Sequence, residues 1–175
     1  KVLMIIPAYN EEESILNTVM SIVEYRKKVD FDLDYVVIND GSVDRTKEIL
    51  DSHHLNAIHL VMNLGIGGAV QTGYKYALEK NYDVAVQFDG DGQHDIESLD
   101  ALLEPIRRQQ ADLVVGSRFI GDKSSEFQTT FMRRFGITII SAFIKLTTGK
   151  RILDTTSGYR LANRDIIRQF AARYP

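Results

Sequence analysis

The sequence contains no cysteine and no tryptophan, and only three of its 175 residues are proline. Without cysteine the fold can have neither a disulfide nor a thiolate metal site, which suits a reducing compartment. Long apolar runs are absent as well, because the longest, residues 137–146, is far shorter than the roughly 20 residues that span a bilayer. The net charge is −3, so no basic excess is available for phosphates, and we expect no nucleic-acid partner.

Short apolar runs instead alternate with helical patterns along most of the chain. The predicted strands are residues 2–6, 35–38, 58–61, 84–88 and 113–116. The predicted helices are residues 14–25, 43–52, 68–80, 95–109 and 130–147, with a last helix from about Asn163. Strands rich in valine and isoleucine, each followed by a helix, predict an α/β fold with a mostly parallel, twisted sheet and helices on both faces. The length fits one domain, residues 1–175.

The stretch QFDGDGQH, residues 87–94, places two carboxylates where the fourth predicted strand ends. Residues two apart on a strand project to the same side, so Asp89 and Asp91 can point at one spot. The glycines around them, Gly90 and Gly92, allow the backbone to bend and a ligand to approach closely. A hairpin is the alternative reading of Asp-Gly. The helical pattern that follows favours a loop over a returning strand.

Two adjacent carboxylates repel one another unless a cation lies between them. Oxygen ligands from Asp89 and Asp91, with Gln93 as a third, suit Mg²⁺ or Mn²⁺. His94 is an alternative contact for the metal. A unit charge pair about 5 Å apart interacts by roughly 3 kcal/mol at an effective dielectric constant of about 20. Because a divalent ion would turn repulsion of a diphosphate into attraction, the site is interpreted as a metal-bridged nucleotide diphosphate.

The turns after the first two predicted strands are also polar. In PAYNEEES, Asn10 is the expected N-cap, with Glu13 completing a capping box. The glutamates there would repel phosphate, so this turn should face hydroxyls, base N–H groups or a ring, with Tyr9 available for stacking. In INDGSVDRT, Asp40 is a candidate acceptor for base or ribose donors, and Ser42 or Asp44 is the next expected N-cap.

The third turn, NLGIGGAVQTG, resembles a phosphate loop but lacks the spacing of a dinucleotide-binding fingerprint and the lysine of a P-loop. Close packing of a helix explains its glycines as well as a ligand does.

Five segments together resemble the family-two inverting glycosyltransferases with the GT-A fold: PAYNEEESI, VINDGSVDRT, QFDGDGQH, VVGSRF and DTTSGYR. The branch that they most resemble comprises the dolichol- and polyprenyl-phosphate hexosyltransferases. The resemblance runs from about Val2 to Arg168. It implies a catalytic domain whose nucleotide-sugar half is about residues 1–117 and whose acceptor half is about residues 118–175.

The resemblance also implies roles for individual residues. The nucleotide sugar would be bound by Pro7, Tyr9, Glu11, Ile38, Asp40, Asp89, Gly90 and Asp91. The metal ligands would be Asp89, Asp91 and Gln93. The acceptor phosphate would be bound by Arg118, Arg133 or Arg134, Ser157 and Arg160. The catalytic residues would be Asp89, Asp91, Arg118 and Asp154. Asp154 could instead cap the turn in DTTSG.

These expectations define the predicted function and its alternatives. The leading hypothesis is metal-assisted single displacement of a hexose from a UDP- or GDP-sugar to a polyprenyl or dolichyl phosphate. The alternatives are a saccharide acceptor, as in cell-wall or capsule synthesis, a non-catalytic nucleotide-sugar-binding module, and a nucleotide-sugar hydrolase. The predicted location is the cytoplasmic side of a membrane, contacted through flanking segments or a partner. A homo-oligomer is compatible with this reading.

Overall fold

The computed structural model describes residues 1–89, 96–116 and 159–174. The chain forms two compact units, residues 1–114 with 159–175 and residues 115–158. The described residues belong almost entirely to the first unit, which includes the returning segment 159–174. The division near residue 117 and the predicted helix at 130–147 lie at or within undescribed residues, and both stay predictions.

The first unit is built on a six-stranded sheet of order β3-β2-β1-β4-β6-β5. Its strands are β1 (Val2–Ala8), β2 (Leu33–Asn39), β3 (Ala57–His59), β4 (Val84–Gln87), β5 (Leu113–Val115) and β6 (Arg160–Asn163). β1 pairs in parallel with β2 and β4, and β2 pairs in parallel with β3, whereas β6 runs antiparallel to β4. The mostly parallel sheet predicted from the sequence is therefore confirmed.

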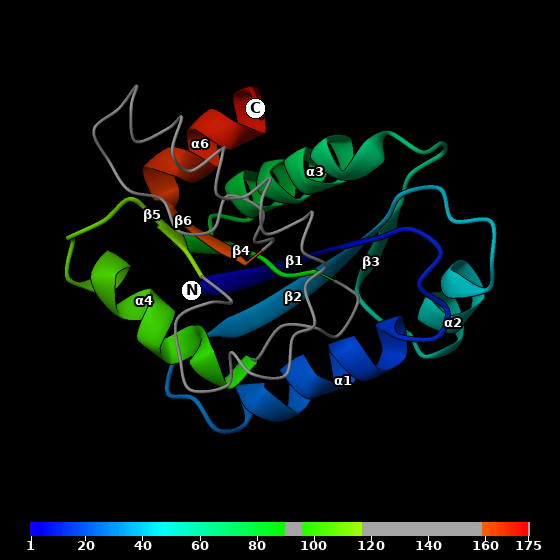
Figure 1. The fold of residues 1–175 in the computed structure, drawn as a ribbon, viewed down its shortest axis with the longest axis horizontal. Coiled ribbons are helices and arrows are strands. Elements are labelled where there is room, and N and C mark those ends of the chain that lie inside the picture. Colours follow the sequence, from blue (N-terminus) through cyan, green and yellow to red (C-terminus); the bar gives the residue numbers. More distant parts are fainter. Residues whose placement is uncertain (90–95, 117–158, 175) are drawn as a thin grey trace, which may run out of the picture. The chain divides into compact units, whose positions relative to one another are not determined.

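Helices cover both faces of the sheet, as predicted (Figure 1). The helical elements are α1 (Ile15–Arg26), α2 (Thr46–Ser52), α3 (Gly65–Glu79), the 3₁₀ turn η1 (Ile96–Ser98), α4 (Leu99–Arg107) and α6 (Arg164–Ala172). One face packs against α1, α2 and α4, and the opposite face packs against α3 and α6. In the parts of the chain that are described, no helix is long and apolar enough to cross a membrane.

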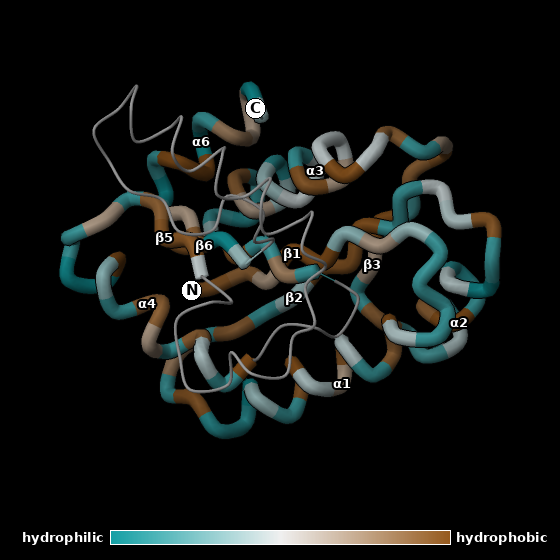
Figure 2. The backbone as a smooth tube through the Cα atoms, viewed as in Figure 1, coloured by the Kyte–Doolittle hydropathy of each residue, from teal (hydrophilic) through white to brown (hydrophobic). Residues whose placement is uncertain are grey.

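The alternation of β1 explains why the sheet has two cores. Met4 and Ile6 point toward α1, while Leu3 and Ile5 point toward α3. Successive strand residues face opposite sides, so a strand that is apolar throughout must be covered on both. Figure 2 shows β1 as a largely hydrophobic segment between helices whose outer surfaces are more hydrophilic.

α3 packs directly against the sheet at residue 73, which is glycine. A Cβ atom at Gly73 would overlap the side chain of Ile5. Close helix packing, one of the two explanations considered for the glycines of this region, therefore holds for Gly73. α3 begins at Gly65, three residues before the predicted start, so its first turn includes glycines that the sequence pattern assigned to a loop.

The end of the chain contains the main difference from the predicted elements. The last helix begins at Arg164, and its N-cap Asn163 accepts hydrogen bonds from the backbone of Asp165 and Ile166, each at 3.1 Å. The strand β6 directly before it was not predicted. Its pattern Arg-Leu-Ala-Asn is short and is recognisable as a strand only through its pairing with β4.

Candidate functional site

A cavity of about 450 Å³ opens at the carboxyl ends of the central parallel strands. In open α/β sheets this edge is the usual place for a ligand. The cavity is lined by the ends of β1, β2 and β4 and by the start of α3. Its lining residues are Pro7, Ala8, Tyr9, Glu11, Asp40, Asn63, Gly65, Ile66, Ala69 and Asp89.

Hydrogen bonds to the β2–α2 loop fix the β1–α1 turn. Asn10 has a left-handed backbone with φ of 57°, its N–H donates to Ser42 Oγ at 3.0 Å, and its Oδ1 accepts from the Val43 N–H at 2.9 Å. The prediction of Asn10 as an N-cap is wrong, because α1 begins later, with Ser14 at the N-cap position. The side chain of Asn10 instead joins the two loops through its hydrogen bond from Val43.

Glu11 is likewise held in place within the turn. Its N–H donates to Thr46 Oγ1 at 2.8 Å, and its Oε2 accepts from the Ser14 hydroxyl at 2.6 Å. Thr46 is fully buried, so this contact joins the turn to the first residue of α2. Glu11 therefore lines the cavity from a fixed backbone.

Asp40 is a buried acid on the cavity wall, only 3% exposed. Its backbone N–H donates to the Ala8 carbonyl at 2.9 Å, and its Oδ1 accepts from the Leu64 N–H at 2.7 Å. The next residue, Gly41, has φ of +67°, and a Cβ atom there would lie 2.7 Å from the backbone nitrogen of Asn63. Only glycine fits this crossing, which holds Asp40 against the loop before α3.

Asn39, which ends β2, supports the same wall through a network that the sequence did not reveal. Its Nδ2 lies 3.0 Å from His59 Nδ1, and His59 Nε2 lies 3.0 Å from Asp51 Oδ1. Its Oδ1 accepts from the Ser42 N–H at 3.1 Å. His59 therefore connects β3 to α2.

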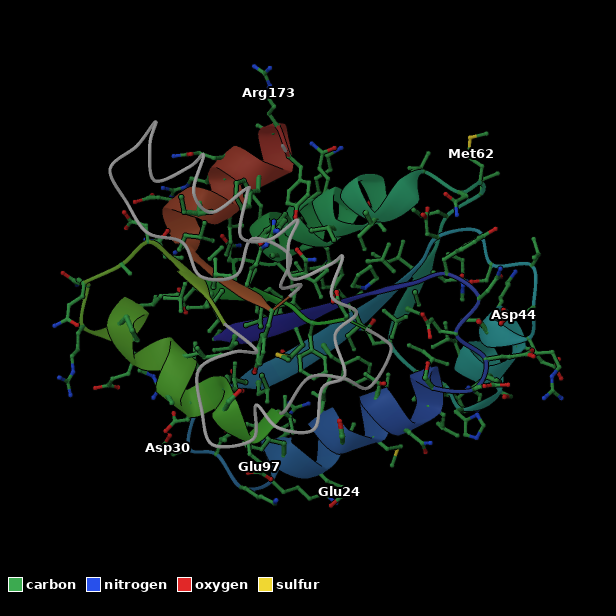
Figure 3. All side chains as sticks on the ribbon, in the orientation of Figure 1. Glu24, Asp30, Asp44, Met62, Glu97 and Arg173 are labelled. Atoms are coloured by element: carbon green, nitrogen blue, oxygen red, sulfur yellow. The ribbon has the colours of Figure 1, made fainter. Side chains whose placement is uncertain are left out.

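Asp44 joins the first two loops. Its Oδ1 accepts from the Thr46 N–H at 3.0 Å, and its Oδ2 accepts from the Glu12 N–H at 3.1 Å. Burial alone would raise its pKa, but the hydrogen bonds from Thr46 and Glu12 outweigh burial and hold the pKa of the carboxyl below its ordinary value. Asp44 lies two residues before Thr46, where α2 begins, so the predicted N-cap position is off by one residue. Figure 3 shows Asp44 beside α2.

Asp89 enters the cavity just beyond the end of β4. Two residues earlier, Gln87 is a buried polar side chain whose Oε1 accepts from the Tyr174 hydroxyl at 3.0 Å. The remaining predicted residues of the acidic motif and of the acceptor side lie outside the described residues. They are Gly90, Asp91, Gln93, Arg118, Arg133, Arg134, Asp154 and Ser157.

The other predicted residues differ in exposure. Tyr9 is 47% exposed and lines the cavity, so its ring is accessible to a ligand. Pro7 also lines it. Ile38 is completely buried in the core beneath α3, and its side chain is not among the lining residues. Arg160 lies on β6 directly opposite Gln87 in the strand register.

The described wall of the cavity carries three carboxylates, Glu11, Asp40 and Asp89, and no lysine or arginine. Such a wall accepts hydrogen bonds from neutral donors such as base N–H groups and sugar hydroxyls, and it repels bare phosphate. The oxygen ligands that it offers are of the kind that Mg²⁺ and Mn²⁺ prefer. Among residues 1–89, 96–116 and 159–174, however, no group of three or more potential ligands could hold a metal ion by itself.

The loop before α3 and the first turn of α3 contribute lining residues that the sequence pattern left unassigned. Asn63 lies in the loop, Gly65 and Ile66 lie in the first turn, and all three line the cavity. The stretch NLGIGG contained the available signal, since glycine at a turn into a helix permits close approach of a ligand. Met62, just before them, projects outward and is 66% exposed (Figure 3).

Known proteins match this chain over nearly all of its length. The family model described as glycosyl transferase family 2 matches residues 4–170. An undecaprenyl-phosphate mannosyltransferase from Micrococcus luteus is 35% identical, over 96% of this chain and 68% of that protein. A UDP-N-acetylglucosamine–dolichyl-phosphate N-acetylglucosaminyltransferase from Methanococcus voltae is 31% identical, over 94% of this chain and 70% of that protein.

A solved structure shares the fold. Glucosyl-3-phosphoglycerate synthase from Mycobacterium tuberculosis, in complex with Mn²⁺ and UDP-glucose, matches 95% of this chain and 57% of that chain with a TM-score of 0.65 at 20% identity. The likeness confirms the predicted GT-A fold. The family match over residues 4–170 and the 35% identity to the Micrococcus luteus protein lead to one conclusion: this chain belongs to glycosyl transferase family 2.

Proposed function

We propose that this chain is the catalytic domain of a glycosyltransferase that moves a hexose from a nucleotide-diphosphate sugar to a polyprenyl phosphate. The observation that carries the proposal is the acidic cavity at the ends of β1, β2 and β4, in a chain of glycosyl transferase family 2. Relatives named for transfer of sugars to undecaprenyl and dolichyl phosphate support the class of acceptor.

The nucleoside half of the donor would occupy the part of the cavity near β1 and β2. The exposed ring of Tyr9 offers a stacking surface, and the carboxylate of Asp40 can accept hydrogen bonds from base or ribose donors. Glu11 faces the same space. Because all three are fixed to buried strands or to hydrogen-bonded turns, the cavity is largely formed before the ligand arrives.

The diphosphate would lie next to Asp89. We assign Asp89, Asp91 and Gln93 as ligands of Mg²⁺ or Mn²⁺, and the oxygen chemistry of Asp89 fits such an ion. The bound ion would neutralise the charge that develops on the departing nucleoside diphosphate. Without a cation, the carboxylates of the cavity wall would repel the diphosphate. The repulsion energy between like charges a few ångströms apart amounts to roughly several kcal/mol.

The acceptor phosphate is the nucleophile in this scheme. One of its oxygens forms a bond to the anomeric carbon while the bond to the diphosphate oxygen breaks on the opposite side, which inverts the configuration. A phosphate monoester has a second pKa of about 6, so it is mostly dianionic at neutral pH and needs no strong general base. Arg118, Arg133 or Arg134, Ser157 and Arg160 are assigned to bind it, with Asp154 orienting it. Arginine suits this role because its guanidinium binds phosphate oxygens in pairs.

The lipid character of the acceptor implies work at a membrane surface. We place the domain on the cytoplasmic face, contacting the bilayer through segments that flank the sequence or through a partner.

A transfer assay tests the proposal. The protein would be incubated with undecaprenyl phosphate and, in parallel, with GDP-mannose, UDP-glucose or UDP-N-acetylglucosamine, with Mn²⁺ or with excess chelator. We expect a lipid-linked sugar from one of these donors and no product with chelator. Calorimetry with UDP and GDP, each with and without Mn²⁺, would identify the nucleotide.

Each alternative gives a different result in the same experiment. Release of free sugar without acceptor indicates a hydrolase. Nucleotide binding without turnover indicates a binding module, and transfer only to an oligosaccharide indicates a polysaccharide-synthesising enzyme. Any of the three results would overturn the proposed transfer of a hexose to polyprenyl phosphate.

A further inference from the structure

Tyr174, near the end of the described chain, packs into an aromatic cluster between α3 and α6. Its ring stacks on Tyr74 with centroids 5.8 Å apart, and it meets Phe170 edge-on at 5.2 Å. Cδ1 of Tyr174 lies 3.9 Å from where a Cβ atom of Gly67 would be, so the ring also touches the first turn of α3. The ring is therefore held in one place by α3 and α6, independently of its hydroxyl.

The hydroxyl of Tyr174 is directed at the sheet, toward two side chains that the strand register brings together. Gln87 on β4 and Arg160 on β6 are directly opposite one another in an antiparallel pair, so their side chains share one face. This face is the one covered by α3 and α6, because Ala85 and Ala162 on the same strands lie in that core. Tyr174 lies over this pair.

The hydroxyl of Tyr174 has two hydrogen-bonding capacities. It donates to Gln87 Oε1 at 3.0 Å, which leaves its oxygen to accept from Arg160, a side chain that can only donate and that lies opposite Gln87 in the strand register. Burial raises the pKa of Tyr174, and the charge of Arg160 opposes that rise. The negative charge of Asp89 raises the pKa further.

We propose that Tyr174 is a positioning residue that holds the guanidinium of Arg160 beside the tip of β4, where that guanidinium binds the acceptor phosphate next to Asp89. The inference rests on the proposed function and extends it to a residue outside the five family-like segments. The hydrogen bond to Gln87 sets the direction of the hydroxyl, since Gln87 is 5% exposed and is fixed on a central strand. The lone pairs of the oxygen are then presented to Arg160.

Tyr74 provides a matched control. Its hydroxyl is also buried between α3 and α6, but among the described residues it has no hydrogen-bond partner. Tyr74→Phe and Tyr174→Phe both remove one hydroxyl from the same aromatic cluster and keep the ring. A general effect of that removal on packing would appear in both variants. An effect through Arg160 would appear only in Tyr174→Phe.

The experiment measures binding and turnover of a short-chain polyprenyl phosphate. We expect Tyr174→Phe to raise the KM and the dissociation constant of polyprenyl phosphate about tenfold, the usual consequence of losing one charge-assisted hydrogen bond. The affinity for the nucleotide should change much less, and Tyr74→Phe should match the wild type. In an Arg160→Gln background, Tyr174→Phe should have no further effect on the acceptor, because the group that it positions is gone.

The outcomes separate this inference from the proposed function. If the wild type transfers sugar and Tyr174→Phe binds polyprenyl phosphate as Tyr74→Phe does, the positioning role is wrong and the proposed function stands. Equal weakening of acceptor binding by Tyr174→Phe with and without Arg160 also refutes it, because the tyrosine would then act by another route. A wild type that binds no polyprenyl phosphate contradicts both.

Discussion

The carboxylate of Asp40 accepts a hydrogen bond from the backbone N–H of Leu64 at 2.7 Å, which joins the end of β2 to the residue just before α3. This bond satisfies one of the N–H groups that a helix start leaves without an intrahelical partner. It also places a buried acid on the cavity wall. The same side chain thus contributes to the fold and, in the proposed function, to recognition of the nucleoside.

The two roles of Asp40 can be separated by substitution. Asp40→Asn keeps an oxygen that can accept from Leu64, so we expect a small loss of stability. It replaces an acceptor by a donor on the other side of the carboxyl, so nucleotide affinity should fall about tenfold or more. Asp40→Ala should lower both affinity and stability, the latter by about 1–3 kcal/mol. Calorimetry with UDP and GDP, together with thermal unfolding, measures the two effects. Unchanged nucleotide affinity in Asp40→Asn would exclude a direct contact.

Asp89 should control the metal dependence of nucleotide binding. In Asp89→Asn we expect Mn²⁺ to give little of the increase in affinity that it gives the wild type, because a neutral amide is a poorer ligand for a hard cation. Asp91→Ala should behave in the same way and abolish transfer. Glu79→Gln removes an exposed acid at the end of α3 and is the control. If Asp89→Asn and Asp91→Ala both respond to Mn²⁺ as the wild type and the control do, the metal assignment fails.

Gly73 should be the position on α3 that tolerates substitution least. In Gly73→Ala the new methyl group would overlap Ile5, which is completely buried, so the helix or the sheet must shift. Such overpacking costs about 1–3 kcal/mol. Urea unfolding measures the loss.

Gly67 and Ile5 provide the controls for that experiment. Gly67→Ala places its methyl group at ordinary contact distance, 3.9 Å from Tyr174, so it should be neutral or should stabilise α3 by up to about 1 kcal/mol. Ile5→Ala removes the atoms that collide, so the double variant with Gly73→Ala should be more stable than the sum of the two single effects. Strict additivity would show that the collision does not limit the fold.

The lowered pKa of Asp44 predicts that the free energy of unfolding depends on pH in the acid range. Its pKa in the folded protein is below the ordinary 3.8, so its contribution is fully present above that value and is lost as pH falls through the lower folded pKa. Asp44→Asn should therefore be less stable than the wild type at neutral pH, by about 1 kcal/mol or less, and the difference should shrink below about pH 4. Unfolding curves of both proteins between pH 2 and pH 7 measure this. A difference that does not vary with pH would mean that the charge of Asp44 is irrelevant to the two loops.

The elements with the strongest local sequence patterns are the ones whose predicted positions agree with the structure. β1, α1 and α4 have long or strongly periodic apolar sequences, and their predicted positions agree with the structure within a few residues. β6 was missed because four residues give little periodicity, and its pairing partner β4 is more than 70 residues away in the chain. The capping role predicted for Asn10 failed because the loop that contains Val43 competes for its side chain.

The sequence by itself determined the two-faced parallel sheet, the acids at its carboxyl edge and the family resemblance, because these depend on residue types and on short-range periodicity. Tertiary structure decided which of those acids share a cavity and how Asn63, Gly65 and Ile66 complete its wall. It alone brought Tyr174 over Gln87 and Arg160. The physical reason is that such contacts join residues far apart in the chain, and local pattern contains no information about which distant groups fill the same space.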